Sequence, residues 1–493
     1  MLSGTVLQGA GKDRTELQHN PDAAPVGYSA PIYGYNADLV ALRNLTVTNI
    51  RTSGNAGLIL KDSTRVAVQG VRMNLGAKTM AWMYGNKNIA VTDSEFLQTG
   101  SIDAPGSSHV THNAGLVFTR NRISFLNNIG TDFDYTHDAY VAGNHWTRDA
   151  VRQHDPGVAH TVTVNFSHRI AIVGNSFDTI NGPVDQTKND GETILTEGGA
   201  LRRTEGLGQV VSATATTVSD PTATINPNAL INKAIPENFG IAIVAGRGMG
   251  QTRQVTAFKA GTFTVERAWD LQPDRSSRYA TAVWGIEKAV IKANVLTNNP
   301  RGIWLYSTAA RDIDMVDNTM RENGGILVRS FQKADKNWLS PIYNIRIESN
   351  SISNTTRRYQ SYLSVHFANY DGQAVGTSHI GVEVRRNSLT ANNPNTDGTN
   401  FMGPAGREGY MIQMNVETSS YVATDTPRLL GTLMQGNSCT NCATAFRLAT
   451  GASGTVLADN QLTSSGALWM NTSSVNSGEL ALRTLVRQLA TGD

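Results

Sequence analysis

The sequence predicts an all-β solenoid in which short parallel strands stack coil upon coil. Two observations predict this class: apolar and polar residues alternate over short segments, and these segments recur at a nearly constant period. Alternation is typical of strands with one buried face, whereas a helix needs apolar residues every three to four positions. A period in the low twenties leaves no room for a helix between strands, so each coil is expected to lie on the previous one.

A corner residue, usually asparagine, ends each repeat. Asn121 and Asn144 are 23 residues apart, and longer spacings contain an additional loop. An asparagine side chain can hydrogen-bond the backbone of the next corner and tolerates left-handed backbone, so a ladder of asparagines along the solenoid is expected. The twelve aligned corner positions are Asn44, Gly70, Asp93, Asn121, Asn144, Asn175, Asn294, Asn318, Asn350, Asn387, Asn437 and Asn460.

The corner pattern divides the chain into four parts. Coils are predicted over 1–199 and again over 286–475. Between them, over 200–285, the asparagine corners stop and strand-like pieces alternate with turns, so this part is interpreted as an inserted β-rich subdomain. The last part, 476–493, is predicted to form a terminal helix or tail.

Three smaller features support this division. The glycine-rich stretch 246–250 lies between strand-like segments, so a hairpin turn is expected there rather than a nucleotide-binding loop. Leucines at helical spacing over 479–489 predict the terminal helix. Cys439 and Cys442 lie at a corner without a second cysteine pair, so they are expected to be structural, either reduced or joined locally.

Composition excludes several classes of function. The chain has 493 residues, and its 42 basic and 40 acidic side chains give a net charge of only +2. Without a dense basic block, it is a poor electrostatic match for nucleic acid or an anionic membrane. No apolar run reaches about 18 residues, so no membrane span is predicted. Residues 1–11 read as a strand and a glycine turn rather than as a signal peptide.

The corner repeat resembles the right-handed parallel β-helix of the pectate-lyase-like superfamily. The resemblance covers about 1–199 and 286–475 and implies about twelve coils with a polysaccharide groove. The superfamily includes glycosidases, polysaccharide lyases and phage tailspike depolymerases, so the resemblance does not select the reaction. The opening segment also looks like an early coil of this group: it reads Val6-Leu7-Gln8-Gly9-Ala10-Gly11, with Thr15-Glu16-Leu17 shortly after.

The resemblance also implies which strand of each coil lines the groove. This strand begins about seven to fourteen residues after the corner, and its alternate side chains point to opposite faces. Alternate residues are expected to face the core, and their neighbours then face the groove; the core-facing set is Phe133, Val151, Ile303, Leu305, Val328 and Val365. The outward set is then Asp132, Asp134, Arg152, His154, Trp304, Tyr306, Arg329 and His366.

Paired carboxylates in this set suggest glycoside hydrolysis. One carboxyl group protonates the leaving oxygen, and the other activates water or attacks the sugar carbon. Asp132 and Asp134 are the predicted pair, with Asp155, Glu192 or Glu197 as a further acid. The predicted substrate-binding residues are cations and aromatics, the latter stacking on sugar rings: Arg152, His154, Lys188, Trp304, Tyr306, Arg329 and His366.

Structural explanations exist for the same residues. Asp132 and Asp134 would also fit loop positions paired with an arginine, and Trp304 and Tyr306 would also fit packing beneath the insertion. The histidine spacing matches no zinc motif, so no metal is predicted for a hydrolase.

The leading hypothesis is an extracellular glycoside hydrolase, secreted or located in the periplasm or at the cell surface, that acts on a polysaccharide or oligosaccharide. A polysaccharide lyase is the first alternative. It would need a base and a cation, for which calcium is a candidate, to neutralise a uronate. A non-catalytic adhesin or a tailspike depolymerase is the second.

Overall fold

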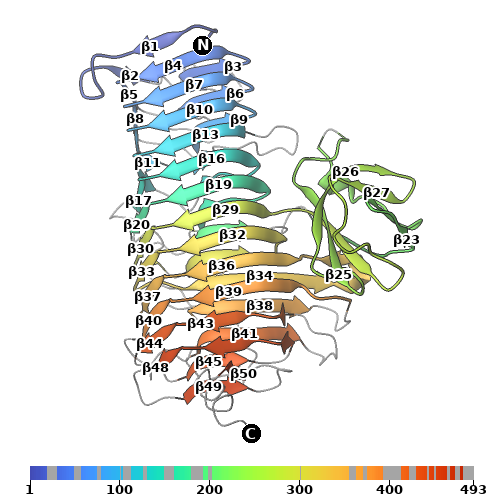
Figure 1. Ribbon diagram of the computed structural model, residues 1–493. Helices are drawn as coiled ribbons and strands as arrows, with labels where there is room; N and C mark the ends of the chain where they lie inside the picture. The colour runs from blue at the N-terminus through green and yellow to red at the C-terminus, as the bar shows by residue number, and fades with distance from the viewer. Residues whose placement is uncertain are drawn as a thin grey trace. The chain divides into compact units, whose positions relative to one another are not determined.

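The chain forms a parallel β-helix in the computed structural model, which confirms the fold class predicted from the sequence (Figure 1). Contacts divide it into two compact units, Met1–Thr196 with Ile286–Ile303, and Glu197–Gly285 with Trp304–Asp493. Among the described residues, no helix has the length and apolar character needed to cross a bilayer. The structure describes residues 1–18, 30–48, 57–74, 79–99, 101–103, 113–125, 130–148, 160–178, 192–197, 203–231, 233–299, 301–354, 362–369, 375–391, 412–420, 429–440, 444–448, 451–462, 467–471 and 478–480.

Three parallel sheets build the first unit, one strand per coil in each (Figure 1). The first sheet contains β1 (Val6–Gln8), β4 (Asp38–Arg43), β7 (Thr64–Gln69), β10 (Lys87–Thr92), β13 (Asn113–Thr119), β16 (Thr136–Ala142), β19 (Ser167–Val173) and β29 (Ile286–Lys292). The second contains β2 (Glu16–Gln18), β5 (Thr46–Thr48), β8 (Arg72–Asn74), β11 (Glu95–Thr99), β14 (Arg122–Phe125), β17 (His145–Arg148), β20 (Ser176–Asp178) and β30 (Val295–Thr297). The third contains β3 (Ile32–Tyr35), β6 (Leu58–Lys61), β9 (Thr79–Tyr84), β12 (Ser101–Asp103), β15 (Thr131–Asp132), β18 (His160–Thr163), β21 (Glu192–Glu197) and the start of β31 (Arg301–Tyr306).

Coils of the same kind form part of the second unit. Its first sheet contains β32 (Ala310–Val316), β36 (Ile342–Glu348), β39 (His379–Arg385), β43 (Leu433–Gln435), β47 (Val456–Ala458) and β50 (Gly478–Leu480), with β42 (Leu429–Leu430) and β46 (Ala452–Ser453) beside them. The second contains β33 (Thr319–Arg321), β37 (Ser351–Asn354), β40 (Ser388–Ala391), β44 (Ser438–Thr440) and β48 (Gln461–Leu462). The third contains β34 (Ile326–Lys333), β38 (Leu363–Asn369), β41 (Ile412–Ser420), β45 (Thr444–Leu448) and β49 (Ala467–Asn471), and the short 3-10 turn η4 (Ala334–Lys336) leads to β35 (Trp338–Leu339), which pairs antiparallel to β34.

A seven-stranded antiparallel sheet occupies the predicted insertion, 200–285. The stretch 246–250 joins two of its antiparallel neighbours, β25 (Phe239–Ala245) and β26 (Thr252–Lys259), so it is the expected hairpin turn. Within the second unit this sheet contacts the coils: Tyr343 Oη donates to Ile243 O at 3.3 Å, and Ser340 Oγ donates to Glu205 Oε1 at 2.9 Å. The strand order is β22 (Gly206–Gln209), β28 (Arg278–Val283), β25 (Phe239–Ala245), β26 (Thr252–Lys259), β27 (Thr262–Val265), β24 (Thr217–Ser219) and β23 (Ser212–Ala213), with the 3-10 turn η3 (Pro227–Ala229) in between.

The core of each coil is filled by side chains that stack on those of the next coil. In the first unit the ring of Trp146 lies 4.8 Å from that of Phe177 and 6.2 Å from that of Phe118, and all three side chains are fully buried. Burial of side chains of this size stabilises the fold by about 1.5–3 kcal/mol each.

The expected asparagine ladder is present. The backbone N–H of Asn144 donates to Oδ1 of Asn175 at 2.9 Å, and that of Asn175 donates to Oδ1 of Asn294 at 3.0 Å. In the second unit Asn318 donates to Asn350 in the same way. These asparagines are buried, so each bond satisfies a backbone donor that has no access to water.

The corner alignment is wrong by one residue in the first three coils. The left-handed residue immediately precedes the ladder position, as with Gly174 (φ 63°) before Asn175. Asn44, Gly70 and Asp93 occupy this left-handed position, and the ladder residues of their coils are Leu45, Val71 and Ser94. A second ladder was not anticipated: Ser63 N donates to Asn86 Oδ1 at 2.9 Å, and Asn86 N to Asn113 Oδ1 at 2.8 Å.

The structure describes only part of the predicted terminal helix and one of the two cysteines. Gly478–Leu480 forms strand β50, so the first residues of the helix predicted over 479–489 are in a strand instead, and the remainder lies outside the described residues. Cys439 is buried and disulfide-bonded, while Cys442 is not among the described residues.

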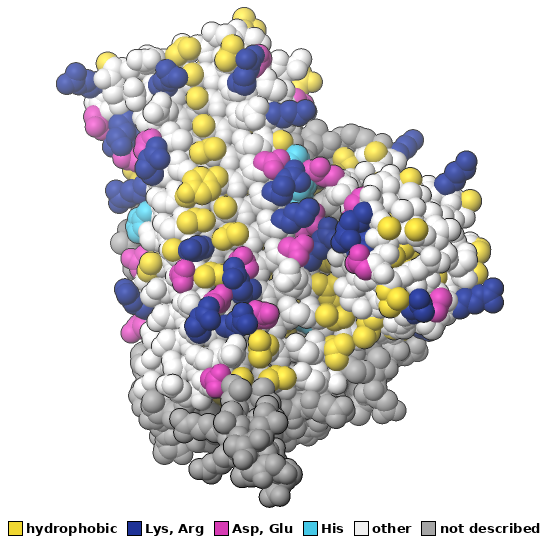
Figure 2. All heavy atoms as spheres, viewed as in Figure 1, with side chains coloured by type: hydrophobic (Ala, Val, Ile, Leu, Met, Phe, Trp, Pro, Cys, Tyr) yellow, Lys and Arg dark blue, Asp and Glu magenta, His cyan; other side chains and the backbone are white. Residues whose placement is uncertain are grey.

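The outward face of the first sheet carries an apolar column in the first unit. Figure 2 shows hydrophobic side chains gathered across these strands, with ionic groups on either side. Tyr140, 48% exposed, and Val117, 39% exposed, are its largest members, and Ala90 and Ala171 continue it in register. The ionic groups include pairs between coils, such as Arg169 with Asp138.

Candidate active site on the third sheet

Asp132 and Asp134 lie on the outward side of the third sheet in the first unit. Asp132 ends β15 and Asp134 follows two residues later, while Phe133 between them is fully buried. The two aspartates are half-buried. Because alternate residues of an extended segment point to opposite faces, the burial of Phe133 directs both carboxyl groups away from the core.

The next coil fixes the orientation of both carboxyl groups. Thr163 Oγ1 donates to Asp132 Oδ1 at 2.7 Å. Asn165 donates its backbone N–H to Asp134 Oδ1 at 2.8 Å and its Nδ2 to Oδ2 at 3.0 Å. Both donors belong to or follow β18, so the alignment of two adjacent coils determines the geometry of the pair.

The two carboxyl groups are in different environments. Burial, followed by the negative charge of Asp132, raises the pKa of Asp134 to about 6, although the hydrogen bonds from Asn165 oppose this change. A carboxyl group with such a pKa holds its proton over much of the mildly acidic range, as a general acid must.

His160, which the sequence analysis did not select, belongs to this site. Its Nε2 lies 3.5 Å from Asp132 Oδ1, and each side chain is 27% exposed. Burial alone would lower the pKa of His160, but the hydrogen bond and charge of Asp132, together with Asp134 and Glu192, raise it above its ordinary value. The carboxyl groups around the imidazole therefore favour its cationic form.

His160 was missed because the groove strand of its coil was assigned to the wrong segment. The prediction placed this strand at 150–155, whereas the described strand is β18, which begins at His160. The usable signal was the alternation through Thr161, Val162 and Thr163. Loops of variable length separate strands from corners, so counting from the corner does not locate the strand.

A buried ion pair closes the other side of the site. Glu192 begins β21 in register with His160, and Arg301 Nη1 donates to Glu192 Oε1. Burial raises the pKa of Glu192 although the charge of Arg301 opposes the rise. Thr193 Oγ1 donates to Arg301 O at 2.7 Å, which ties the two segments together. Glu192 thus has a positively charged partner, and its role as a further acid stays a prediction.

Two further acids, Asp155 and Glu197, are also predicted from the sequence. Glu197 ends β21, in which Leu195 is in register with Thr163, and Thr163 in turn with Asp132. Asp155, and the predicted binding residues Arg152, His154 and Lys188, lie outside the described residues. Their predicted roles stay predictions.

Trp304, Tyr306, Arg329 and His366 lie in the second unit. The Trp304 and Tyr306 rings are stacked at 5.9 Å, and Arg329 Cζ lies 4.5 Å from the centroid of Tyr306. Arg329 and His366 are in register on β34 and β38. The sequence predicts that these side chains point outward and are open to a ligand. Trp304 is only 2% exposed, Arg329 6% and His366 7%, so all three are buried. Their role in substrate binding remains a prediction.

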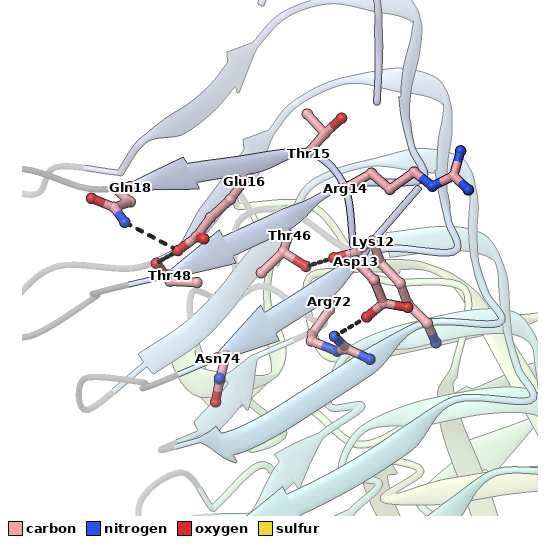
Figure 3. Close-up of a pocket in the computed structure, with 10 residues that line it drawn as sticks. All are labelled: Lys12, Asp13, Arg14, Thr15, Glu16, Gln18, Thr46, Thr48, Arg72 and Asn74. Atoms are coloured by element: carbon pink, nitrogen blue, oxygen red, sulfur yellow. Dashed lines mark hydrogen bonds and ion pairs between the residues drawn. The ribbon is translucent and has the colours of Figure 1, made fainter. Parts of the chain in front are cut away.

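A separate pocket of about 670 Å³ lies against the second sheet in the first coils (Figure 3). Arg72 bridges Asp13 at 2.5 Å and Glu95 at 2.7 Å, and Lys12 also contacts Glu95. Burial would raise the pKa of Glu95, but hydrogen bonds from Lys12 and Arg72 lower it below its ordinary value. This charge pairing does not supply a protonated carboxyl group. The lining residues are Lys12, Asp13, Arg14, Thr15, Glu16, Gln18, Thr46, Thr48, Arg72 and Asn74.

Comparisons with known proteins find similar solved structures at low identity. No family model and no curated protein match the chain. The Dettilon tailspike protein aligns at 13% identity and a TM-score of 0.35, covering 87% of this chain and 62% of the tailspike. The A-module of a mannuronan C-5 epimerase from Azotobacter vinelandii aligns at 12% identity and a TM-score of 0.33, covering 97% and 85%.

A third similar structure is the catalytic unit of an alpha-1,3-glucanase from Streptomyces thermodiastaticus. It aligns at 12% identity and a TM-score of 0.36, covering 97% of this chain and 59% of that one. The chain therefore spans less than two thirds of the length of both the tailspike and the glucanase.

Proposed function

We propose that this protein is a glycoside hydrolase that cleaves a polysaccharide outside the cytoplasm, with Asp134 as general acid and Asp132 as the second catalytic carboxylate. The observation that carries the proposal is the position of two carboxyl groups on one outward face in different environments. Asp132 faces the His160 imidazole and accepts a hydrogen bond from Thr163, whereas the half-buried Asp134 lies beside the negative charge of Asp132. Such a difference separates the acid from the base in carboxylate pairs.

The proposed reaction gives each carboxyl group a separate role when the glycosidic bond breaks. Asp134 gives its proton to the glycosidic oxygen as the bond from that oxygen to the anomeric carbon breaks. Asp132 either accepts a proton from the water that bonds to that carbon, or bonds to the carbon itself until water replaces it and gives its proton to the ionised Asp134. His160 Nε2, which lies 3.5 Å from Asp132 Oδ1, opposes the negative charge of this carboxylate when the imidazole is protonated.

A neutral glycan fits this site better than a uronate polymer. A lyase must neutralise the substrate carboxylate with a cation or a metal. The basic side chains described at this site, His160 and Arg301, already face the carboxyl groups of Asp132 and Glu192.

The reaction class can be tested by incubating the protein with panels of neutral and uronate polysaccharides. New reducing ends and ultraviolet absorbance should be followed together, because a lyase creates a C=C bond and a hydrolase does not. We expect reducing ends without absorbance, on neutral polymers. Absorbance on a uronate polymer would instead establish the lyase. Tight binding without any new ends would favour the adhesin.

A further inference from the structure

We propose that Tyr33 and Tyr35 form a sugar-stacking platform on the same face of the third sheet as the catalytic pair. The substrate would then be a polymer that lies across successive strands, with cleavage at Asp132 and Asp134 and a distant sugar unit on the tyrosines. This inference rests on the proposed function and extends it to the length and direction of the substrate.

Exposure of the two tyrosines is the first observation. Along β3 the burial alternates: Ile32 and Gly34 are buried, while Tyr33 is 47% and Tyr35 55% exposed. Two residues apart on a strand, the tyrosines lie about 7 Å from each other on one face. A single exposed aromatic needs no explanation, but an aligned pair on the sheet that carries the acids does.

Strand register connects this pair with the catalytic residues. Tyr33 is in register with Ile59, which is in register with Trp82. Trp82 is in register with Asp103, and Asp103 with Asp132. One column across five strands therefore joins Tyr33 to Asp132, and four strand spacings place them about 19 Å apart. Only a substrate of several sugar units spans this distance.

Aromatic residues recur in the first part of both columns. In the first column, Trp82 on β9 follows Tyr33 on β3. In the second column, Tyr35 is in register with Lys61, and Lys61 with Tyr84. The solenoid thus places aromatic residue types at equivalent positions on β3 and on β9. A row of this kind, running across the strands, matches a linear polymer rather than a compact ligand.

The chemistry around Tyr35 favours a sugar over an apolar partner. Lys61 Nζ lies 5.5 Å from the Tyr35 centroid, so an ammonium group faces the ring beside the tyrosine hydroxyl. A pyranose ring has an apolar C–H face for stacking and a rim of hydroxyl groups for polar contacts. Aromatic faces with polar edges supply both kinds of contact.

The test compares the double variant Tyr33→Ala/Tyr35→Ala with Tyr140→Ala, a matched control with similar exposure on the first sheet. We expect the double variant to raise KM at least about tenfold on the polymer, as a loss of 1.4 kcal/mol in binding does. Its kcat should stay unchanged, and so should cleavage of oligosaccharides too short to reach β3. Tyr33→Phe/Tyr35→Phe should behave like the parent, because stacking is preserved.

Binding measured in an Asp134→Asn background separates this proposal from the function on which it rests. Affinity electrophoresis in the polymer should show weaker retention when both tyrosines are removed. Unchanged retention and KM would overturn the platform while leaving the hydrolase intact. An equal loss of activity on short and long substrates would also overturn the platform. So would a double variant whose sedimentation changes while its retention in the polymer gel does not. No retention and no turnover of any polymer by the parent would overturn both.

Discussion

Asp134 is the residue on which the proposed chemistry depends most directly. Asp134→Asn removes the proton donor and Asp132→Asn removes the second carboxylate, while amide groups keep the size of the side chains. We expect each to lower kcat by about 10²–10⁴-fold with little change in polymer binding, since proton transfer contributes about that much. Initial rates of reducing-end release, together with retention in a polymer gel, measure the two effects separately.

Asp138→Asn serves as the matched control for both variants. Asp138 is exposed on the first sheet, where it pairs with Arg169. This variant should retain parental rates. If Asp132→Asn and Asp134→Asn do so too, the acid pair has a structural role and the assignment of the active site is wrong.

The pH dependence of activity should follow Asp134. Its pKa of about 6 predicts a fall in rate as the pH rises through that value, because the acid must start protonated. Asn165→Ala removes the Nδ2 donor to Oδ2, a contact that favours the ionised form. The pKa of Asp134 should therefore rise further, and the alkaline limb of the kcat/KM profile should move to higher pH.

Asn344→Ala is the control for this shift, because Asn344 Nδ2 donates to Asp312 on an exposed surface of the second unit. Its pH profile should coincide with that of the parent. A profile of Asn165→Ala that moves to lower pH, or does not move at all, would show that Asp134 is not the titrating acid.

At the scale of single elements, the corner before each ladder asparagine is a site of backbone strain. Ala293 has φ 54° and Gly174 φ 63° at equivalent positions, although a β-carbon disfavours this conformation. Ala293→Gly should therefore raise the free energy of unfolding by about 1 kcal/mol, and Gly174→Ala should lower it by a similar amount. Chemical denaturation of both variants measures the changes.

Gly174 makes this comparison clean, because an added β-carbon would meet no atom within 4 Å. Any destabilisation of Gly174→Ala then reports backbone conformation rather than a clash. Equal stability of parent and both variants would mean that the coil absorbs the strain elsewhere.

The same element explains where sequence reasoning succeeded and where it failed. Asn144 and Asn175 can be recognised in the sequence because the buried backbone donor of one coil is satisfied by the side-chain acceptor of the next. In one coil the ladder residue is Val71, which is apolar and carries no corner signal. The alignment therefore selected the preceding Gly70, because glycine also fits the left-handed position of a corner. A corner requires a residue that tolerates left-handed backbone and, next to it, a side-chain acceptor for the ladder. The sequence does not show which of these two requirements a given residue meets.

Whole-molecule packing was less accessible from the sequence than the coils were. Alternation predicted that Phe133, Ile303 and Val365 face the core, and each is at most 1% exposed. It also placed Trp304 and Arg329 outward, where they are nevertheless buried. Alternation along a strand predicts on which face of the sheet a side chain lies. Whether that face is buried depends on contacts with segments distant in sequence.

Acidification should destabilise the whole molecule. Hydrogen bonds from Arg65, Arg120 and Arg169 lower the pKa of their carboxylate partners on neighbouring coils, Asp38, Asp93 and Asp138. Such groups stabilise the fold above the ordinary aspartate pKa of about 3.9, and this contribution is lost as pH falls through the lower folded-state value. Tm from circular dichroism should therefore decrease from pH 5 toward pH 2.

The triple variant Asp38→Asn/Asp93→Asn/Asp138→Asn identifies the source of that decrease. Ion pairs as exposed as these contribute little, so the variant should lose little stability at pH 7 and show a flatter dependence on acid. Coincident Tm profiles of parent and variant would assign the acid sensitivity to other groups.

The ladder bond between Asn175 and Asn294 has a consequence for how such chains acquire new parts. It joins residues 119 positions apart at 3.0 Å, while Asn121 and Asn144 are joined across 23 positions at 2.9 Å. By loop-closure scaling, the longer connection costs at most about 1.5 kcal/mol more. Coil geometry is therefore almost independent of the length of chain spliced between coils, and grafting or exchange of segments at this junction is thermodynamically inexpensive.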